Sequence, residues 1–304
     1  MQAEPLIQWS EVATEYVGFI GSFLAAGAVG FRYSSLRGRL AEPGPGGAVG
    51  EPERRVYADA ARRAAVLGLV GALVGAVLLA LRLPELAARR HMAVGELVTG
   101  DFGTGAQVVL TVLALVGFAL AAARRPVGWP LAAVGVVVGA LRGVLTGQWA
   151  RLVNPVHVLS AGLWIGTLFV LVTCGLAMVL RDEPARERRG PIAADMVNAF
   201  SPLALGSGGV VVLFGVITAW RHLKRLDALW TTPYGYALIA KLCVVAVVFG
   251  LGAWNWRRQR PTMGTEEAAV SLRRSARSEL IAAAIVLVIT AVLVSLPAPG
   301  TPPH

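Results

Sequence analysis

Eight long apolar segments, separated by polar stretches, run through the chain. Each has about 18 residues or more, and a helix of that length crosses the roughly 30 Å hydrocarbon core of a bilayer. The sequence therefore predicts an all-α fold, a polytopic membrane bundle with eight transmembrane helices. The expected spans are residues 14–31, 64–81, 105–123, 127–145, 152–180, 200–220, 235–256 and 280–296.

Composition supports this fold class, and the placement of charge adds an orientation. Of the 304 residues, 56% are hydrophobic and 15% are charged, and the mean hydropathy of +0.64 is far above that of a soluble domain. Nineteen Lys and Arg residues lie in the loops of one side and seven in those of the other. Because positively charged loops stay in the cytoplasm, both termini are expected outside. The net charge of +10 then reflects topology, and no nucleic-acid partner is expected.

The eight spans form two groups of four along the chain. This layout predicts an N-terminal four-helix half at residues 1–150, a second four-helix half at 151–299 and a short Pro-rich tail at 300–304. The stretch AEPGPGGAVGEPE, between the first two spans, is typical of an irregular linker. The short connection from Arg124 to Pro126 predicts that the third and fourth spans form an antiparallel hairpin.

One span, NPVHVLSAGLWIGTLFVLV, differs from the others because it contains His157. No other predicted span has a histidine within its apolar run. On a helix, His157, Ser160 and Trp164 share one stripe. Gly162 and Gly166 lie on roughly the opposite side, where a small-xxx-small pair allows a neighbouring helix to approach closely. A histidine at this depth needs a partner, because an unsatisfied polar group in hydrocarbon is costly. We therefore expect one polar face and one packing face.

Five sequence pieces follow one another over roughly residues 155–299. They are HVLSAGLWIG at 157–166, FSPLAL at 200–205, TAWRHLKRLDALWTTPYGYALIAKL at 218–242, AWNWRR at 253–258 and RRSARSELI at 273–281. In this order they resemble the copper-resistance D family (CopD/PcoD) of bacterial inner-membrane proteins. The resemblance implies copper uptake across the cytoplasmic membrane from the periplasmic side, often beside a small periplasmic copper-binding partner of the CopC type. Both termini would then be periplasmic.

Side chains that suit copper lie on the outer side in this topology. Copper(I) favours thioether, thiolate and imidazole ligands, and copper(II) favours imidazole and oxygen. We expect His157 to be an inner ligand, and His222, His91 and Met92 to contribute to an outer site. Copper is expected as the transported or bound substrate. Four further residues are expected to line the site or pathway: Trp164, Ser160, Lys241 and Tyr234.

Each of these residues also has a purely structural interpretation. His157 could hydrogen-bond Ser160 or a neighbouring carbonyl, and His222 could be an ordinary interfacial histidine at a helix end. His91 and Met92 could form a surface pair. Lys241 could extend outward to water, or pair with a carbonyl or with Asp227. The aromatic turn that contains Tyr234 could belong to an interfacial belt.

Other residues argue against a complete copper pathway. No ladder of Met, His or Cys descends from His157 towards the cytoplasmic end. Arg142 and Lys241 place positive charge in the outer half, which opposes the passage of a cation. Cys174 and Cys243 both lie within apolar spans and are expected to be buried as small hydrophobic side chains.

Several function classes can be set aside on sequence grounds. A b-type haem would need two facing axial histidines, so no haem is expected. The chain carries no Walker loop, HExxH motif or nucleophile elbow, so no enzymatic activity is expected. The remaining alternative to a copper transporter is a non-transporting accessory or structural subunit of a larger membrane complex.

Overall fold

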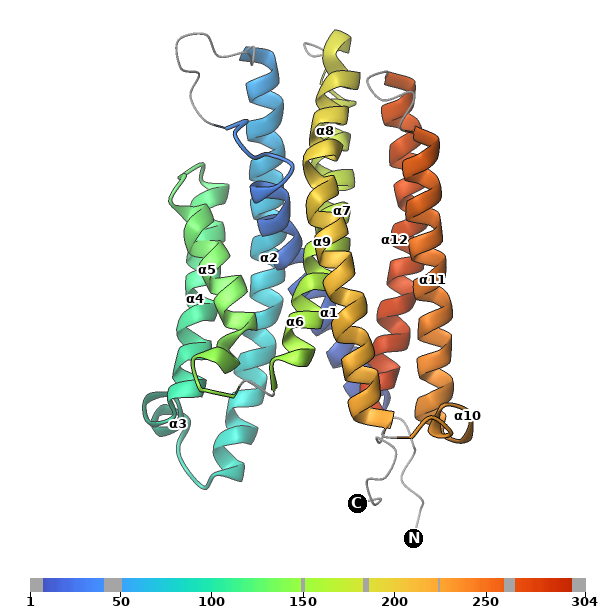
Figure 1. Ribbon diagram of the computed structural model, residues 1–304. Coiled ribbons are helices and arrows are strands. Elements are labelled where there is room, and N and C mark those ends of the chain that lie inside the picture. Colours follow the sequence, from blue (N-terminus) through green and yellow to red (C-terminus); the bar gives the residue numbers. More distant parts are fainter. Residues whose placement is uncertain are drawn as a thin grey trace.

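The computed structural model describes residues 8–40, 51–148, 151–182, 186–223, 225–259 and 266–296. The predicted tail at 300–304 and most of the predicted linker lie outside these residues. Figure 1 shows the helices running side by side along one axis. In chain order the elements are α1 (Trp9–Tyr33), α2 (Glu51–Arg89), α3 (Val94–Gly100), α4 (Phe102–Ala122), α5 (Gly128–Ala140), η1 (Arg142–Val144), α6 (Val153–Ala161), η3 (Gly162–Gly166), α7 (Thr167–Val170), η4 (Leu171–Leu176), α8 (Ala177–Val179), η5 (Arg186–Arg188), α9 (Arg189–Leu223), α10 (Ala228–Thr231), α11 (Pro233–Gln259) and α12 (Glu266–Ser295).

Seven of the described helices are long and apolar enough to cross a membrane, which makes the chain a multi-pass helical membrane protein. The predicted eighth crossing, at 127–145, is not confirmed. There α5 has only 13 residues, about 20 Å of helix. The chain then makes a 3-10 turn at Arg142–Val144 and bends at Gly147, whose φ is +68°. A charged side chain and a left-handed glycine thus interrupt a run that hydropathy alone treats as continuous.

The first turn of α1 and the last turn of α12 lie at the same end of the bundle, at the bottom of Figure 1. This arrangement agrees with two termini on one side of a membrane, and the periplasmic side stays a prediction. The expected hairpin of the third and fourth spans is confirmed as α4 and α5. The two helices pack so closely that a methyl group on Gly117 would collide with the backbone of Ala132.

The segment from α6 to α8 is a single span, Val153–Val179, with two π-helical stretches, η3 and η4. In the most apolar 18-residue stretch of this span, 67% of the residues are buried, whereas the corresponding share is 39% or less in each of the other six described spans. Such π-helical turns insert an extra residue into a helix and often occur at functional sites. The span that contains His157 is therefore the most enclosed span of the described bundle.

The predicted packing face of this span is confirmed. Gly166 lies against the backbone of Phe23 and Gly27 in α1, and a methyl group there would collide with the Phe23 carbonyl. One turn earlier, Gly162 faces Ala26 of α1. The buried core continues across residue 150, because it joins Phe31 and Phe118 to residues of η4 and α9. The division at residue 150 stays a prediction, and the two halves share one core.

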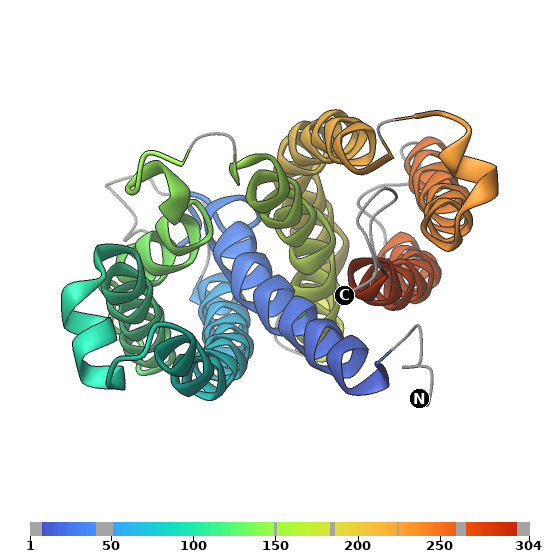
Figure 2. The same cartoon turned by 90° about the horizontal axis from the view of Figure 1, so that it is seen from below.

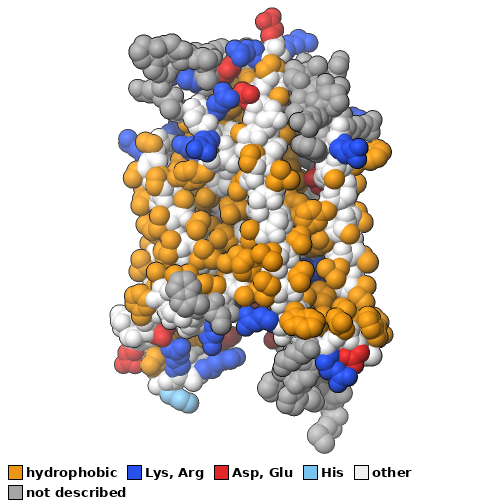
Figure 3. Space-filling view, viewed as in Figure 1, with side chains coloured by type: hydrophobic (Ala, Val, Ile, Leu, Met, Phe, Trp, Pro, Cys, Tyr) orange, Lys and Arg blue, Asp and Glu red, His pale blue; other side chains and the backbone are white. Residues whose placement is uncertain are grey.

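The outer surface of the bundle is apolar along its middle. Figure 3 shows hydrophobic side chains over the central part of one face and charged side chains towards its two ends. Leu205 is 76% exposed and Val109 is 64% exposed, which in water would form an unfavourable apolar surface. In a bilayer these side chains contact acyl chains, so this band is the lipid-facing surface.

The two cysteines differ in their surroundings. Cys174 of η4 is buried, as expected. The same expectation is wrong for Cys243, which is exposed. Cys243 lies on α11, a helix at the edge of the bundle with only 11% of its most apolar window buried. A helix with neighbours on one side only leaves most of its apolar residues facing lipid.

The turn before α4 is held by Asp101. Its carboxylate accepts hydrogen bonds from the Thr104 hydroxyl (2.6 Å) and backbone N–H (2.8 Å) and from Arg90 (2.9 Å). The bond from the Thr104 hydroxyl contributes most, and together the three bonds hold the pKa of the Asp101 carboxyl well below its usual range. Because the folded protein binds this proton less readily than the unfolded chain, the stabilisation is present above the unfolded pKa, about 4, and declines as the pH falls below it.

We expect Asp101→Ala to lower the melting temperature of the detergent-purified protein at pH 7, and the difference from wild type to shrink below about pH 4. Asp101→Asn should lose less, since the amide oxygen still accepts the backbone N–H of Thr104. Thermal unfolding of the three proteins between pH 3 and pH 7 measures this effect. A difference that stays constant over that range would contradict it.

Candidate functional site

His157 lies in α6, half-buried and facing α9. Its Nδ1 is 2.9 Å from the backbone carbonyl oxygen of Val211. A carbonyl oxygen only accepts, so Nδ1 carries the hydrogen and donates it. In the neutral ring, Nε2 then keeps its lone pair. The polar partner that the sequence required is therefore a carbonyl of another helix, which was one of the two structural alternatives for this residue.

Glycines on α9 make room for the imidazole ring. A methyl group on Gly215 would lie 3.0 Å from the Cε1 atom of His157, closer than van der Waals contact. Two turns earlier, Gly208 faces the rings of Trp164 and Phe249. Gly208, Val211 and Gly215 share one stripe of α9 because they are three and four residues apart. This stripe was missed from sequence, although the run GSGGVVVLFG at 206–215 carries its signal.

The third wall of the site comes from α11. The ring centroids of Phe249 and Trp164 are 4.6 Å apart, with their planes tilted by 39°. Two turns earlier on α11, Lys241 lies close enough for its charge to act on the His157 ring. Ser160, one turn beyond His157, is buried. The structure thus gathers three of the predicted residues near one another: His157, Trp164 and Lys241.

The ammonium group of Lys241 does not pair with Asp227, one of the partners considered for it. Asp227 forms a two-bond ion pair with Arg225, at 3.1 and 2.8 Å. Among the residues that the structure describes, no other side chain forms a hydrogen bond or ion pair with Lys241.

His222 forms a separate pair with Tyr234 near the end of α9. Its Nδ1 donates to the carbonyl of Thr218 at 2.8 Å, and its ring stacks on Tyr234 at a centroid distance of 5.9 Å. His222 is exposed and Tyr234 is buried. Val211 and Thr218, the carbonyl partners of His157 and His222, are seven residues apart on α9, a rise of about 10 Å. The two histidines are therefore anchored at different levels of the same helix.

His91 and Met92 are exposed in the turn that follows α2, where His91 has a φ of +53°. Figures 1 and 2 place α3, next along the chain, and α10, next to His222, on opposite sides of the same end of the bundle. The structure therefore does not bring His91 and Met92 together with His222. Across the described ranges, no three His, Cys, Asp or Glu side chains gather as a metal-binding group.

Comparison with known proteins points to copper. Residues 194–293 match the family model of copper resistance protein D. The copper transport protein CutJ of Bacillus subtilis (strain 168) is 30% identical over 154 residues, which cover 50% of this chain and 26% of CutJ. The chain thus spans about a quarter of the length of that relative. No solved structure matches.

The matched segment contains His222, Tyr234 and Lys241, as well as the α9 stripe opposite His157. His157, Ser160 and Trp164 precede it, and so do His91 and Met92. The copper-family segment therefore supplies two walls of the site, α9 and α11, and the preceding span supplies the histidine. The two matches thus relate part of this multi-pass membrane chain to copper resistance protein D and to a copper transport protein.

Proposed function

We propose that the protein moves copper across the cytoplasmic, or inner, membrane from the periplasmic side, with His157 as a ligand on the way. The supporting observation is the hydrogen bond from His157 Nδ1 to the Val211 carbonyl. Histidines that bind metals commonly donate their second ring N–H to a backbone carbonyl, which fixes the tautomer and orients the ring. The free Nε2 is then a ligand that both oxidation states of copper accept.

The charge of Lys241, which opposes the entry of a cation, would also make a bound cation easier to release. A positive charge beside a bound copper ion weakens its binding. Conduction requires binding strong enough to admit an ion and weak enough to release it. In this proposal Lys241 shortens the time that copper spends at His157, while Trp164 and Phe249 form the wall beyond it.

The proposed orientation rests on charge placement, since nineteen basic residues on one side against seven on the other favour periplasmic termini. His222 stacks on Tyr234 at the end of the bundle where α1 begins and α12 ends. There it would meet copper delivered by a periplasmic protein of the CopC type. The proposed role involves no catalytic step.

Copper uptake into sealed proteoliposomes that contain the purified protein tests the proposal. We expect copper to accumulate in vesicles with protein and not in matched empty vesicles, for copper(I), copper(II) or both. Absence of uptake under both conditions would contradict transport and favour the accessory-subunit alternative. In that case, co-purification with a larger membrane complex would be the next measurement.

A further inference from the structure

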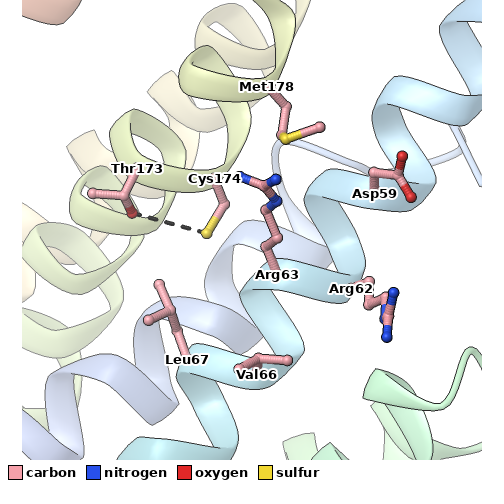
Figure 4. A pocket seen from close by; sticks show the side chains of 8 residues that line it. All are labelled: Asp59, Arg62, Arg63, Val66, Leu67, Thr173, Cys174 and Met178. Atoms are coloured by element: carbon pink, nitrogen blue, oxygen red, sulfur yellow. Dashed lines mark hydrogen bonds between the residues drawn. The ribbon is translucent and has the colours of Figure 1, made fainter. Parts of the chain in front are cut away.

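A cavity of about 570 Å³ lies between α2 and the segment of η4 and α8, at the end of the bundle away from the termini. Figure 4 shows the side chains around it. One wall carries the polar groups of α2, and the other carries Thr173, Cys174 and Met178. The α2 lining residues are Asp59, Arg62, Arg63, Val66 and Leu67.

The charge around this cavity is net positive. Asp59 is already neutralised, because its carboxylate is 2.8 Å from the guanidinium of Arg124 in the α4–α5 turn. Arg62 and Arg63 are exposed, and within the described part of the chain neither has an anionic partner. In Figure 4 the Arg63 side chain extends towards Cys174 and Met178, and the Arg62 side chain leaves the same helix in another direction. Each guanidinium carries several donors that suit a phosphate group. Both groups also oppose a metal cation, despite the soft sulfur atoms of Cys174 and Met178 nearby.

The position of these arginines along α2 matches the level of lipid phosphates. Between Arg63 and Arg82 the helix has eighteen residues without a charge. They span about 27 Å, close to the thickness of the hydrocarbon core. Arg62 and Arg63 therefore lie at one boundary of the core, where phospholipid headgroups begin. By the charge distribution of the loops, this is the cytoplasmic leaflet.

An apolar path for acyl chains continues from the cavity along α2. Val66, Val70, Leu73 and Val77 are each 44–56% exposed. They follow one another at intervals of three and four residues, so they form one stripe of the helix beneath Arg62. A single phospholipid could therefore place its phosphate at the arginines and its acyl chains on this stripe.

We propose that this cavity binds the headgroup of an anionic phospholipid of the cytoplasmic leaflet. Basic pockets between transmembrane helices on that side suit anionic headgroups. The inference goes beyond copper transport and does not depend on it, because it rests on α2, η4 and α8 and involves neither His157 nor α11. A bound lipid would join α2 to the central span at the end where the α4–α5 turn also meets α2.

The test uses the purified full-length protein in nanodiscs of phosphatidylcholine with an added fraction of phosphatidylglycerol. Native mass spectrometry counts the phosphatidylglycerol molecules that stay bound. We expect Arg62→Gln/Arg63→Gln to weaken this binding about thirtyfold, since each juxtamembrane arginine is worth about 1 kcal/mol with anionic lipid. Arg62→Lys/Arg63→Lys keeps both charges and should retain most of the binding.

The matched control is Arg37→Gln/Arg186→Gln, which removes two exposed arginines that do not line the cavity. This control should bind phosphatidylglycerol as wild type does. Equal weakening in both double variants would overturn the proposal, because it would indicate general surface charge. Displacement of the lipid by millimolar inorganic phosphate would also overturn it, in favour of a site for small soluble anions. Thermal unfolding of every variant in phosphatidylcholine alone shows that each is folded.

Discussion

Replacing His157 by alanine is expected to reduce copper uptake into proteoliposomes by at least about tenfold. The variant removes the free Nε2 that we propose as the ligand and the side-chain donor to the Val211 carbonyl. Changing a residue that only orients a metal ligand already lowers metal affinity about 10–100-fold, so removing the ligand itself should cost at least about tenfold. The initial rate of copper accumulation, with equal amounts of reconstituted protein, measures the effect.

His157→Asn separates the ligand role from a structural one. The asparagine amide can donate to the Val211 carbonyl from a position close to that of Nδ1, but it offers no nitrogen lone pair in place of Nε2. A ligand role predicts that His157→Asn restores the melting temperature lost in His157→Ala and does not restore uptake. Recovery of uptake together with stability would show that the residue only holds α6 against α9.

His91→Ala is the histidine control for this experiment. His91 is exposed in the turn after α2, on the side of the bundle opposite α10. We expect its removal to lower uptake by less than about twofold, because no metal-binding group of three or more side chains surrounds it among the described residues. An effect as large as that of His157→Ala would require copper to enter on the α3 side and would contradict the proposed path.

Gly166→Leu is expected to have the largest effect on folding. The α carbon of Gly27 would lie 3.1 Å from a methyl group at this position, and the Phe23 carbonyl would collide with it. Both obstacles are backbone atoms, so no rotamer change relieves them. Overpacking costs about 1–3 kcal/mol where side chains can move, and the separation of α1 from the central span should cost at least the upper value.

The melting temperature in lipid nanodiscs, with the yield of monodisperse protein, checks this prediction. A loss of about 3 kcal/mol corresponds to a drop of roughly 6–12 °C for a domain of 150–250 residues. Gly75→Leu makes the same chemical change on α2, where nothing lies within 4 Å of an added methyl group. This control should be neutral or slightly stabilising, since leucine favours helix more than glycine does. Equal destabilisation by the two variants would contradict the packing argument.

The sequence by itself determined the membrane class and the two faces of the central span. Long uncharged runs predict spans because the bilayer sets a fixed length. The opposition of His157 to Gly166 follows from the 3.6-residue period, which is a local property of the helix. The same local reasoning left the crossing at α5 unconfirmed, because Arg142 and a left-handed glycine follow its 13 residues. It was wrong at Cys243, since periodicity does not say which helices lie at the edge of a bundle.

Only the tertiary structure decided what each face meets. The partner of His157 is a carbonyl 54 residues away in sequence, and the approach of Lys241 and Phe249 depends on how α11 is placed and rotated against α6. The separation of His91 from His222, and the cavity beside Arg62 and Arg63, likewise arise from the arrangement of helices around a shared core. These relations depend on every interhelical contact at once, because steric fit between helix surfaces sets their neighbours and rotations, and no local pattern encodes that fit.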